Sequence, residues 1–172
     1  MDCGCAPGSW SQVAAKMINS KGKFGTDTLA GLLIGCDLLP VEPVKGAILL
    51  PGKDFTEPNV QALIKDLVKS RPFDVVLSDM APNASGVKGL DSDRIMRMAV
   101  KVKEFTVKHG YMGTSMVIKV WQSGQLSNFV HSLKEEFRTA QLYKPKATRK
   151  ESGEIYIVAQ DLFSCSYNDK SR

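Results

Sequence analysis

The alternation of short strand-like runs with helical patterns is the feature that most constrains how this chain can fold. Runs rich in β-branched and other apolar residues predict strands at residues 29–39, 46–52, 73–80, 114–121 and 154–163, with a further strand at 139–147. Between them, helical spacing of apolar residues predicts helices at residues 9–20, 57–70, 91–110 and 126–137. This order predicts a doubly wound, Rossmann-like α/β fold, a mostly parallel sheet with helices on both faces.

Length and composition narrow the class of protein. With 172 residues the chain is one domain by size, and we expect it to span residues 1–163, followed by a disordered tail at 164–172. The net charge of +5 favours a polyanionic partner. No apolar run reaches membrane-spanning length, and no segment of the sequence resembles a secretory signal.

The four cysteines do not form a recognisable metal or disulfide pattern. Cys3, Cys5, Cys36 and Cys165 contain no C-x-x-C pair, and the chain has two histidines. We therefore expect no metal site, and reduced thiols in an intracellular compartment.

In doubly wound sheets, ligands bind beyond the carboxyl ends of the strands, so the residues that follow each run are the candidates for a site. The chain opens on a turn with Gly4 and Gly8 around Cys5-Ala6-Pro7. Glycines let a ligand approach the backbone, and the helix that follows offers free N–H groups. The turn matches neither G-x-G-x-x-G nor a Walker A loop, so no dinucleotide or nucleoside triphosphate is indicated. A plain strand-to-helix turn is the alternative.

Three aspartates lie at or just after the ends of predicted strands. Asp37 is placed to accept hydrogen bonds from a ribose hydroxyl pair, and Asp54 to bind an exocyclic amine. The alternative for each is a helix cap or a surface turn. Asp79 leads into a loop with Pro82, Asn83 and Gly86 that cannot continue as regular structure.

Lys119 is the most informative single residue, because it lies inside an otherwise apolar strand. Burial lowers the pKa of a lysine, which is how enzymes obtain a lysine base. The alternative is an edge-strand lysine that points to water. Glu154 opens another strand and follows a basic run that contains Lys144, Lys146, Arg149 and Lys150. That run is either a solvated basic face or a surface that contacts phosphates.

Six segments together resemble one family. They are "DCGCAPGSWSQV", "CDLLPVEPVKGA", "DFTEP", "VVLSDMAPNASG", "VIKVWQSG" and "KPKATRKESGEIYIVA". In order and spacing they are similar to the FtsJ-like S-adenosylmethionine-dependent RNA 2′-O-methyltransferases, from residue 2 to about residue 160. The wording "SDMAPN" is most like the branch that modifies a uridine of large-subunit ribosomal RNA, which includes mitochondrial members.

The resemblance implies a cofactor site for S-adenosyl-L-methionine. It assigns Asp37 to the cofactor's ribose, Asp54 to its adenine, and Asp79 to its methionine moiety and the reaction centre. It assigns to the cofactor's amino-acid end the residues Pro7, Gly8, Ser9 and Trp10.

The resemblance also implies a catalytic set. The family's tetrad is Lys-Asp-Lys-Glu, and Asp79, Lys119 and Glu154 match its last three members. The first lysine normally lies on a helix upstream of the glycine turn. Because only Asp2 and Cys3 represent the first strand here, we expect that strand to be truncated and Met1 to be an internal or mis-assigned start.

The function implied is methyl transfer from S-adenosyl-L-methionine to the ribose 2′-hydroxyl of a uridine in large-subunit ribosomal RNA, in support of ribosome biogenesis. We expect a monomer that binds ribosomal RNA or the large subunit through Lys144, Lys146, Arg149 and Lys150, with no membrane association and with mitochondrial localisation. Two alternatives stay open. One is a methyltransferase-like assembly factor with little or no activity, and the other is a transfer-RNA 2′-O-methyltransferase.

Overall fold

The computed structural model describes residues 1–19, 31–81, 85–149 and 152–164. The chain divides into two compact units, Met1–Arg71 and Pro72–Arg172, and each is described by itself. The expected tail at 164–172 lies almost wholly outside the described residues.

The first unit is built on parallel strands. Its elements are β1 (Asp2–Cys3), α1 (Ser9–Asn19), β2 (Leu33–Asp37), β3 (Ala47–Pro51) and α2 (Pro58–Leu67). The strand order is β3-β2-β1, and both pairings are parallel. The central strand β2 is buried from Leu33 to Cys36, as expected for a parallel strand covered on both faces. Its last residue, Asp37, is half-buried and marks the carboxyl end of the strand.

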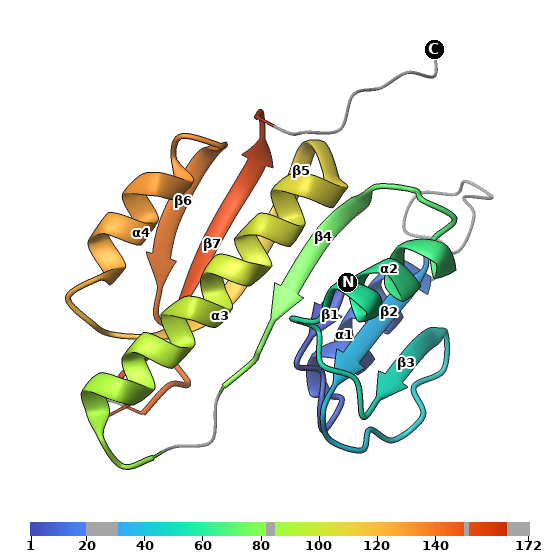
Figure 1. Ribbon diagram of the computed structural model, residues 1–172, viewed down its shortest axis with the longest axis horizontal. Helices are drawn as coiled ribbons and strands as arrows, with labels where there is room; N and C mark the ends of the chain where they lie inside the picture. Colours follow the sequence, from blue (N-terminus) through green and yellow to red (C-terminus); the bar gives the residue numbers. More distant parts are fainter. Residues whose placement is uncertain (20–30, 82–84, 150–151, 165–172) are drawn as a thin grey trace. The chain divides into compact units, whose positions relative to one another are not determined.

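The second unit contains a mixed sheet with two helices on one face (Figure 1). Its elements are β4 (Phe73–Ser78), α3 (Lys88–His109), β5 (Gly110–Trp121), α4 (Leu126–Leu133), β6 (Phe137–Tyr143) and β7 (Glu154–Leu162). The strand order is β4-β5-β7-β6, in which β4 and β5 are parallel and β7 is antiparallel to both of its neighbours. Figure 1 shows α3 crossing in front of β5 and α4 lying in front of β6.

The alternation along β5 decides which side chains face the helices. Met116, Ile118 and Val120 are buried, and Ile118 lies opposite Ile157 of β7. Because successive side chains of a strand point to opposite faces, Lys119 and Trp121 lie on the face away from α3 and α4. The helices thus cover the apolar face of the sheet, and the other face carries the candidate catalytic lysine.

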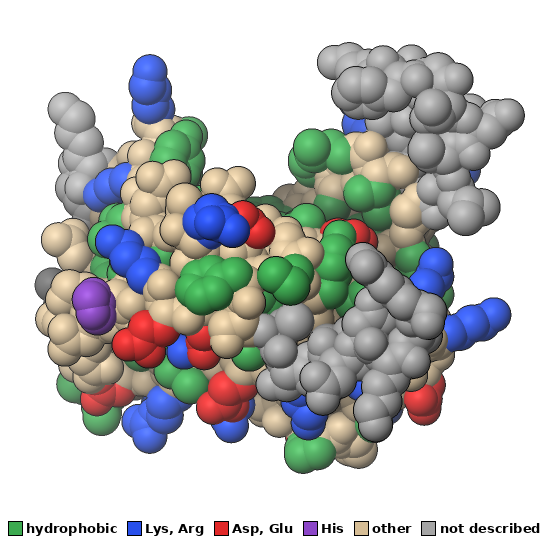
Figure 2. All heavy atoms as spheres, turned by 90° about the horizontal axis from the view of Figure 1, so that it is seen from above, with side chains coloured by type: hydrophobic (Ala, Val, Ile, Leu, Met, Phe, Trp, Pro, Cys, Tyr) green, Lys and Arg blue, Asp and Glu red, His purple; other side chains and the backbone are tan. Residues whose placement is uncertain are grey.

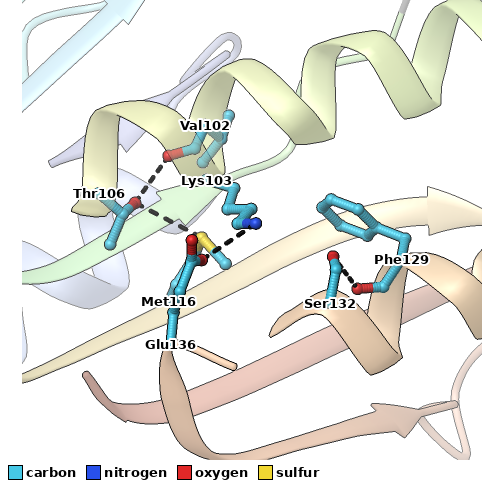
Figure 3. Close-up of polar contacts among 7 residues, drawn as sticks. All are labelled: Val102, Lys103, Thr106, Met116, Phe129, Ser132 and Glu136. Atoms are coloured by element: carbon cyan, nitrogen blue, oxygen red, sulfur yellow. Dashed lines mark hydrogen bonds and ion pairs between the residues drawn. The ribbon is translucent and has the colours of Figure 1, made fainter. Parts of the chain in front are cut away.

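One ion pair links α3 to the residue that precedes β6, and two hydrogen bonds lie within helices (Figure 3). The Lys103 ammonium of α3 lies 3.1 Å from a carboxylate oxygen of Glu136, and both side chains are mostly buried. The Thr106 hydroxyl donates to the Val102 carbonyl oxygen at 2.7 Å, and the Ser132 hydroxyl donates to the Phe129 carbonyl oxygen at 2.8 Å. These contacts are structural, and Lys103 is a second mostly buried lysine of this unit that is paired with a carboxylate.

The structure confirms the predicted α/β class and the mostly parallel strands, and it corrects several boundaries. The strand predicted at 139–147 lies at 137–143, and α3 begins at Lys88 rather than at residue 91. The strand predicted at 114–121 begins at Gly110, because the Thr114 hydroxyl accepts from the Tyr111 N–H and donates to the Phe73 carbonyl oxygen. Residues 29 and 30 of the first predicted run lie outside the described part of the chain.

Gly110 ends α3, as predicted, but for a steric reason. Its φ of −82° is in the extended region rather than the left-handed one. A Cβ atom at this position would lie 2.6 Å from the Thr106 carbonyl oxygen and 2.8 Å from the Thr114 hydroxyl. A glycine is therefore required because α3 passes directly into β5 with no room for a side chain.

Candidate active site

The opening turn of the first unit folds back onto the end of β2. The Gly4 N–H donates to the Cys36 carbonyl oxygen at 2.8 Å, and the Ala6 N–H donates to Oδ2 of Asp37 at 2.7 Å. Gly8 has a φ of +115°, a conformation that favours glycine, and α1 begins at the next residue. The turn presents an exposed Pro7 and an exposed Ser9, with Trp10 half-buried in the first turn of α1.

Asp37 lies where the sequence predicts it, at the carboxyl end of β2. Its Oδ1 accepts from the Leu39 N–H at 2.8 Å, while Oδ2 holds the opening turn through Ala6. Each carboxylate oxygen has two lone-pair sites, so both oxygens retain acceptor capacity for a pair of hydroxyls. Asp37 thus has a structural role, and it fits the predicted ribose contact as well.

Asp54 forms a surface turn, the alternative to an adenine contact that the sequence left open. Its Oδ1 accepts from both the Thr56 N–H at 2.8 Å and the Thr56 hydroxyl at 2.7 Å, which forms an Asx turn ahead of α2. The N-cap of α2 is Glu57. The predicted adenine contact of Asp54 therefore depends on Oδ2, which forms no hydrogen bond with the described residues.

The buried pair of Asp2 and Ser11 was not identified from the sequence. The Ser11 hydroxyl donates to Oδ2 of Asp2 at 2.6 Å, and both residues are fully buried. The pair ties the first turn of α1 to β1 on either side of the glycine turn. The sequence signal from which this pair could have been identified is the acidic residue Asp2 directly before the turn. A carboxylate buried in an apolar environment needs a hydrogen-bond partner.

Three cysteines of the first unit are buried free thiols. They are Cys3, Cys5 and Cys36. Burial, with a smaller contribution from the charges of nearby aspartates, raises the pKa of Cys5 to about 12 and that of Cys36 to about 11. Burial also raises the pKa of Cys3 well above its ordinary value. In the described part of the chain, no three His, Cys, Asp or Glu side chains gather as a set of metal ligands.

These thiols are expected to resist alkylation in the folded protein. At pH 8 the thiolate fraction of Cys36 falls about a hundredfold when its pKa rises from 9.0 to about 11, and the thiolate is the reactive form. Because the folded-state pKa values are raised, their contribution to stability is complete below pH 9 and is lost as the pH rises toward 11 and 12.

The measurement is iodoacetamide labelling at pH 8, read for each cysteine by mass spectrometry with and without denaturant. Cys165 lies outside the described residues and is quantified separately. Rapid labelling of Cys36 in the native protein would contradict the burial described here.

In the second unit, Lys119 and Asp79 form a close ion pair. The Lys119 Nζ lies 2.7 Å from Oδ1 of Asp79, and the two side chains are 13% and 30% exposed. Asp79 directly follows β4, and β5 lies between β4 and β7. The interpretation of Lys119 as an edge-strand lysine in solvent is therefore wrong. It is a largely buried cation held by a carboxylate that the neighbouring strand delivers.

Glu154 opens β7, as predicted, and it binds a residue that the sequence analysis did not identify. The Tyr156 hydroxyl donates to Oε1 of Glu154 at 2.6 Å. Tyr156 lies directly opposite Lys119 in the antiparallel pairing of β5 with β7. Burial raises the pKa of Tyr156, and the hydrogen bond to Glu154 and the charges of Glu154 and Asp79 raise it further. Tyr156 lies two residues beyond Glu154 on the same strand, so the two side chains point to the same face of the sheet. This spacing was the sequence signal from which Tyr156 could have been identified.

The loop after Asp79 is fastened at its far end. Asp91 of α3 accepts from the Ser85 N–H at 2.9 Å and from the Ser85 hydroxyl at 2.7 Å. These hydrogen bonds lower the pKa of Asp91. Gly86 follows with a φ of +81°, whereas Pro82 and Asn83 lie outside the described residues. The loop is thus anchored where α3 begins.

The predicted RNA-contacting residues lie on the connection between β6 and β7. Lys144, Lys146 and Arg149 are exposed, and the Lys144 Nζ donates to the Ser152 carbonyl oxygen at 2.9 Å. None of the three forms an ion pair with a described acidic side chain, and Lys150 lies outside the described residues. This connection is at the same end of the unit's sheet as Asp79 and the end of β5.

Two polar side-chain contacts lie at the opposite end of that sheet, where β4 begins and β7 ends. The Arg138 guanidinium lies 2.6 Å from Asp161, and the Tyr111 hydroxyl donates to Asp74 at 2.9 Å. Figure 2, which looks onto the molecule from the top of Figure 1, shows basic and acidic side chains interleaved there with apolar ones. The basic side chains of the β6–β7 connection lie instead at the end of the sheet that carries the candidate catalytic residues.

Comparisons with known proteins give consistent results. The model of the family described as FtsJ-like methyltransferase matches residues 1–162. The ribosomal RNA large subunit methyltransferase E of Paracidovorax citrulli is 39% identical over 162 residues, which are 94% of this chain and 73% of that protein. The mitochondrial rRNA methyltransferase 2 of Drosophila melanogaster is 34% identical, over 94% of this chain and 64% of its own length.

Solved structures agree with the sequence relatives. A Plasmodium falciparum protein described as a ribosomal RNA methyltransferase has a TM-score of 0.78 and 25% identity, over 95% of this chain and 85% of its own. A Streptococcus mutans protein described as a methyltransferase, solved in complex with SAH, has a TM-score of 0.55 and 13% identity, over 94% of this chain and 84% of its own. The second likeness shows the fold alone.

Proposed function

Because the chain belongs to the FtsJ-like methyltransferase family, we propose that it methylates the ribose 2′-hydroxyl of a uridine in large-subunit ribosomal RNA. S-adenosyl-L-methionine is the cofactor. The observation that carries the proposal is the ion pair between Lys119 and Asp79, whose charged atoms lie 2.7 Å apart. Lys119 lies opposite Tyr156 on the neighbouring strand, and the Tyr156 hydroxyl donates to Glu154.

The first unit supplies the proposed cofactor contacts. When bound, S-adenosyl-L-methionine supplies a methyl group already activated on a sulfonium. Gly8 shapes the turn through its positive φ, which favours glycine. The proposed contacts to the cofactor's amino-acid end come from this turn, at Pro7, Gly8, Ser9 and Trp10. The remaining lone pairs of Asp37 take the ribose hydroxyls, and Oδ2 of Asp54 takes the adenine amine.

The second unit supplies the proposed chemistry. The activated methyl group requires chiefly that a 2′-oxygen be aligned with it and that the hydroxyl proton leave. Lys119 is the base or the cation that stabilises the alkoxide, and its ion pair with Asp79 favours the second role. Asp79 orients the ammonium, while Glu154, fixed by Tyr156, adds a second carboxylate on the same face.

The RNA is held, in this proposal, by Lys144, Lys146, Arg149 and Lys150, which would contact phosphates without reading the sequence. We further propose a role in mitochondrial ribosome biogenesis, on the strength of the Drosophila relative. Microscopy of the tagged full-length protein tests the compartment. Among the described residues no helix is long and apolar enough to cross a bilayer.

The proposal is tested by incubating the purified chain with methyl-labelled cofactor and one of three substrates: unmodified large ribosomal subunits, deproteinised large-subunit RNA, and transfer RNA. A label in large-subunit RNA, at a uridine whose 3′ linkage resists alkaline hydrolysis, is the expected result. A label in transfer RNA alone would favour the transfer-RNA alternative. Cofactor binding without transfer to any of the three would favour the assembly-factor alternative.

A further inference from the structure

Three side chains lie in one row across the sheet of the second unit. Lys119 of β5 is directly opposite Tyr156 of β7, and Tyr156 is directly opposite Tyr143 of β6. Residues directly opposite each other on antiparallel strands point to the same face. Tyr143 therefore lies on the face of Lys119, away from α3 and α4, two strands or about 10 Å along the sheet.

The two tyrosines of this row differ in their surroundings. Tyr156 is half-buried, and its hydroxyl is taken up by Glu154. Tyr143 is 56% exposed at the last position of β6, and its hydroxyl forms no hydrogen bond with the described residues. Its ring is thus accessible to a ligand on the face of the sheet that carries Lys119.

The chain beyond Tyr143 has a charge that suits a nucleic acid. Lys144 is the next residue, and its ammonium donates a hydrogen bond to the Ser152 carbonyl oxygen at 2.9 Å. Lys146 and Arg149 are exposed on the same connection. An aromatic ring on a strand, beside basic side chains that track a backbone, is the arrangement by which proteins hold single-stranded RNA. Every base has a π-face, so such a contact tolerates sequence variation.

We propose that Tyr143 is a stacking platform for a base of the RNA substrate adjacent to the nucleotide held at Lys119. This proposal rests on the proposed function and adds to it a residue that positions the RNA. Stacking on Tyr143 would keep the strand extended and unpaired across the row, so that a ribose faces Lys119 rather than lying within a duplex.

The test measures RNA binding separately from methyl transfer. A single-stranded 12-nucleotide RNA, oligouridine with one central 2-aminopurine, is titrated with the full chain in the presence of S-adenosylhomocysteine. Stacking quenches the 2-aminopurine fluorescence. We expect Tyr143→Ala to raise the Kd about tenfold and to remove most of the quenching. Tyr143→Phe and Tyr143→Trp should retain both, because they keep the ring.

The matched control is Tyr111→Ala, at the opposite end of the same sheet, where the ring is 38% exposed. It should bind the RNA as the wild-type chain does. Thermal unfolding of each variant verifies that the fold is retained. Equal binding by wild type and Tyr143→Ala would overturn the proposal, as would Tyr143→Phe binding as weakly as Tyr143→Ala, or no quenching with the wild-type chain.

Transfer assays distinguish failure of this proposal from failure of the proposed function. With large-subunit RNA as substrate, Tyr143→Ala should raise KM about tenfold and change kcat by less than about twofold. A wild-type chain that quenches the RNA probe but transfers no methyl group would refute the proposed function and leave the stacking contact supported. A wild-type chain that transfers methyl groups, with an unchanged KM in Tyr143→Ala, would refute the stacking contact alone.

Discussion

Replacing Lys119 with methionine is expected to lower the rate of methyl transfer by about a thousandfold, within the range of about 10²–10⁴ attributed to a positioned catalytic group. Methionine keeps the length of the side chain but removes the charge that lies 2.7 Å from Asp79. The 2′-oxygen then lacks the ammonium group, whether that group acts as the base or stabilises the alkoxide. Single-turnover transfer to large-subunit RNA measures the effect, and calorimetric titration with S-adenosylhomocysteine should give a Kd within about threefold of wild type.

Lys103→Met is the matched control. Lys103 is also mostly buried and paired with a carboxylate, Glu136, within the same unit, but it lies on α3, on the helix-covered face of the sheet (Figure 3). Its loss should lower thermal stability and leave the rate per folded molecule unchanged. Transfer at the wild-type rate by Lys119→Met would remove Lys119 from the mechanism. Equal loss in both variants would indicate a structural effect instead.

The second large effect is expected at Asp37. Asp37→Ala should weaken binding of S-adenosylhomocysteine by about 10- to 100-fold, since hydrogen bonds to a charged group contribute about 1.5–3 kcal/mol. The substitution removes the proposed ribose acceptor and, with it, the bond from the Ala6 N–H that holds the opening turn. Asp37→Asn retains one acceptor oxygen and should fall between the alanine variant and wild type. Calorimetric titration measures all three.

Asp66→Ala is the corresponding control, because Asp66 is an exposed carboxylate on α2 in the same unit. It removes the same charge from the unit without touching the turn or β2. Binding by Asp66→Ala should match wild type. If Asp66→Ala and Asp37→Ala weaken binding equally, the effect is one of net charge, and the assignment of Asp37 to the ribose fails.

Much of the fold follows from local patterns. The apolar residues of β2 and β4 and the helical spacing of α2 and α4 predict these elements with small errors at their ends. The errors have physical causes. The helix predicted at 91–110 ends at Gly110 because Thr106 and Thr114 leave no room for a Cβ atom there. That contact joins a helix to a strand and has no local signal.

Some residues of the candidate site could likewise be found from the sequence, and others could not. Asp37, Asp79, Lys119 and Glu154 are found from the sequence because each lies within an apolar run or at one of its ends. The bond from Ser11 to Asp2 and the role of Tyr156 are not found, because each depends on a partner that the local pattern does not specify.

By itself, the sequence determined which residue types stand at the strand ends, and therefore which chemistry is available. Only the tertiary structure decided which of them meet. β7 inserts antiparallel between β5 and β6, and this pairing of segments distant in sequence places Tyr156 opposite Lys119 and Tyr143 opposite Tyr156. The same is true of the contact between Lys119 and Asp79, which requires β4 and β5 to be neighbours. Register between distant strands is set by packing of the whole sheet, because shifting a strand by one residue turns every side chain to the other face.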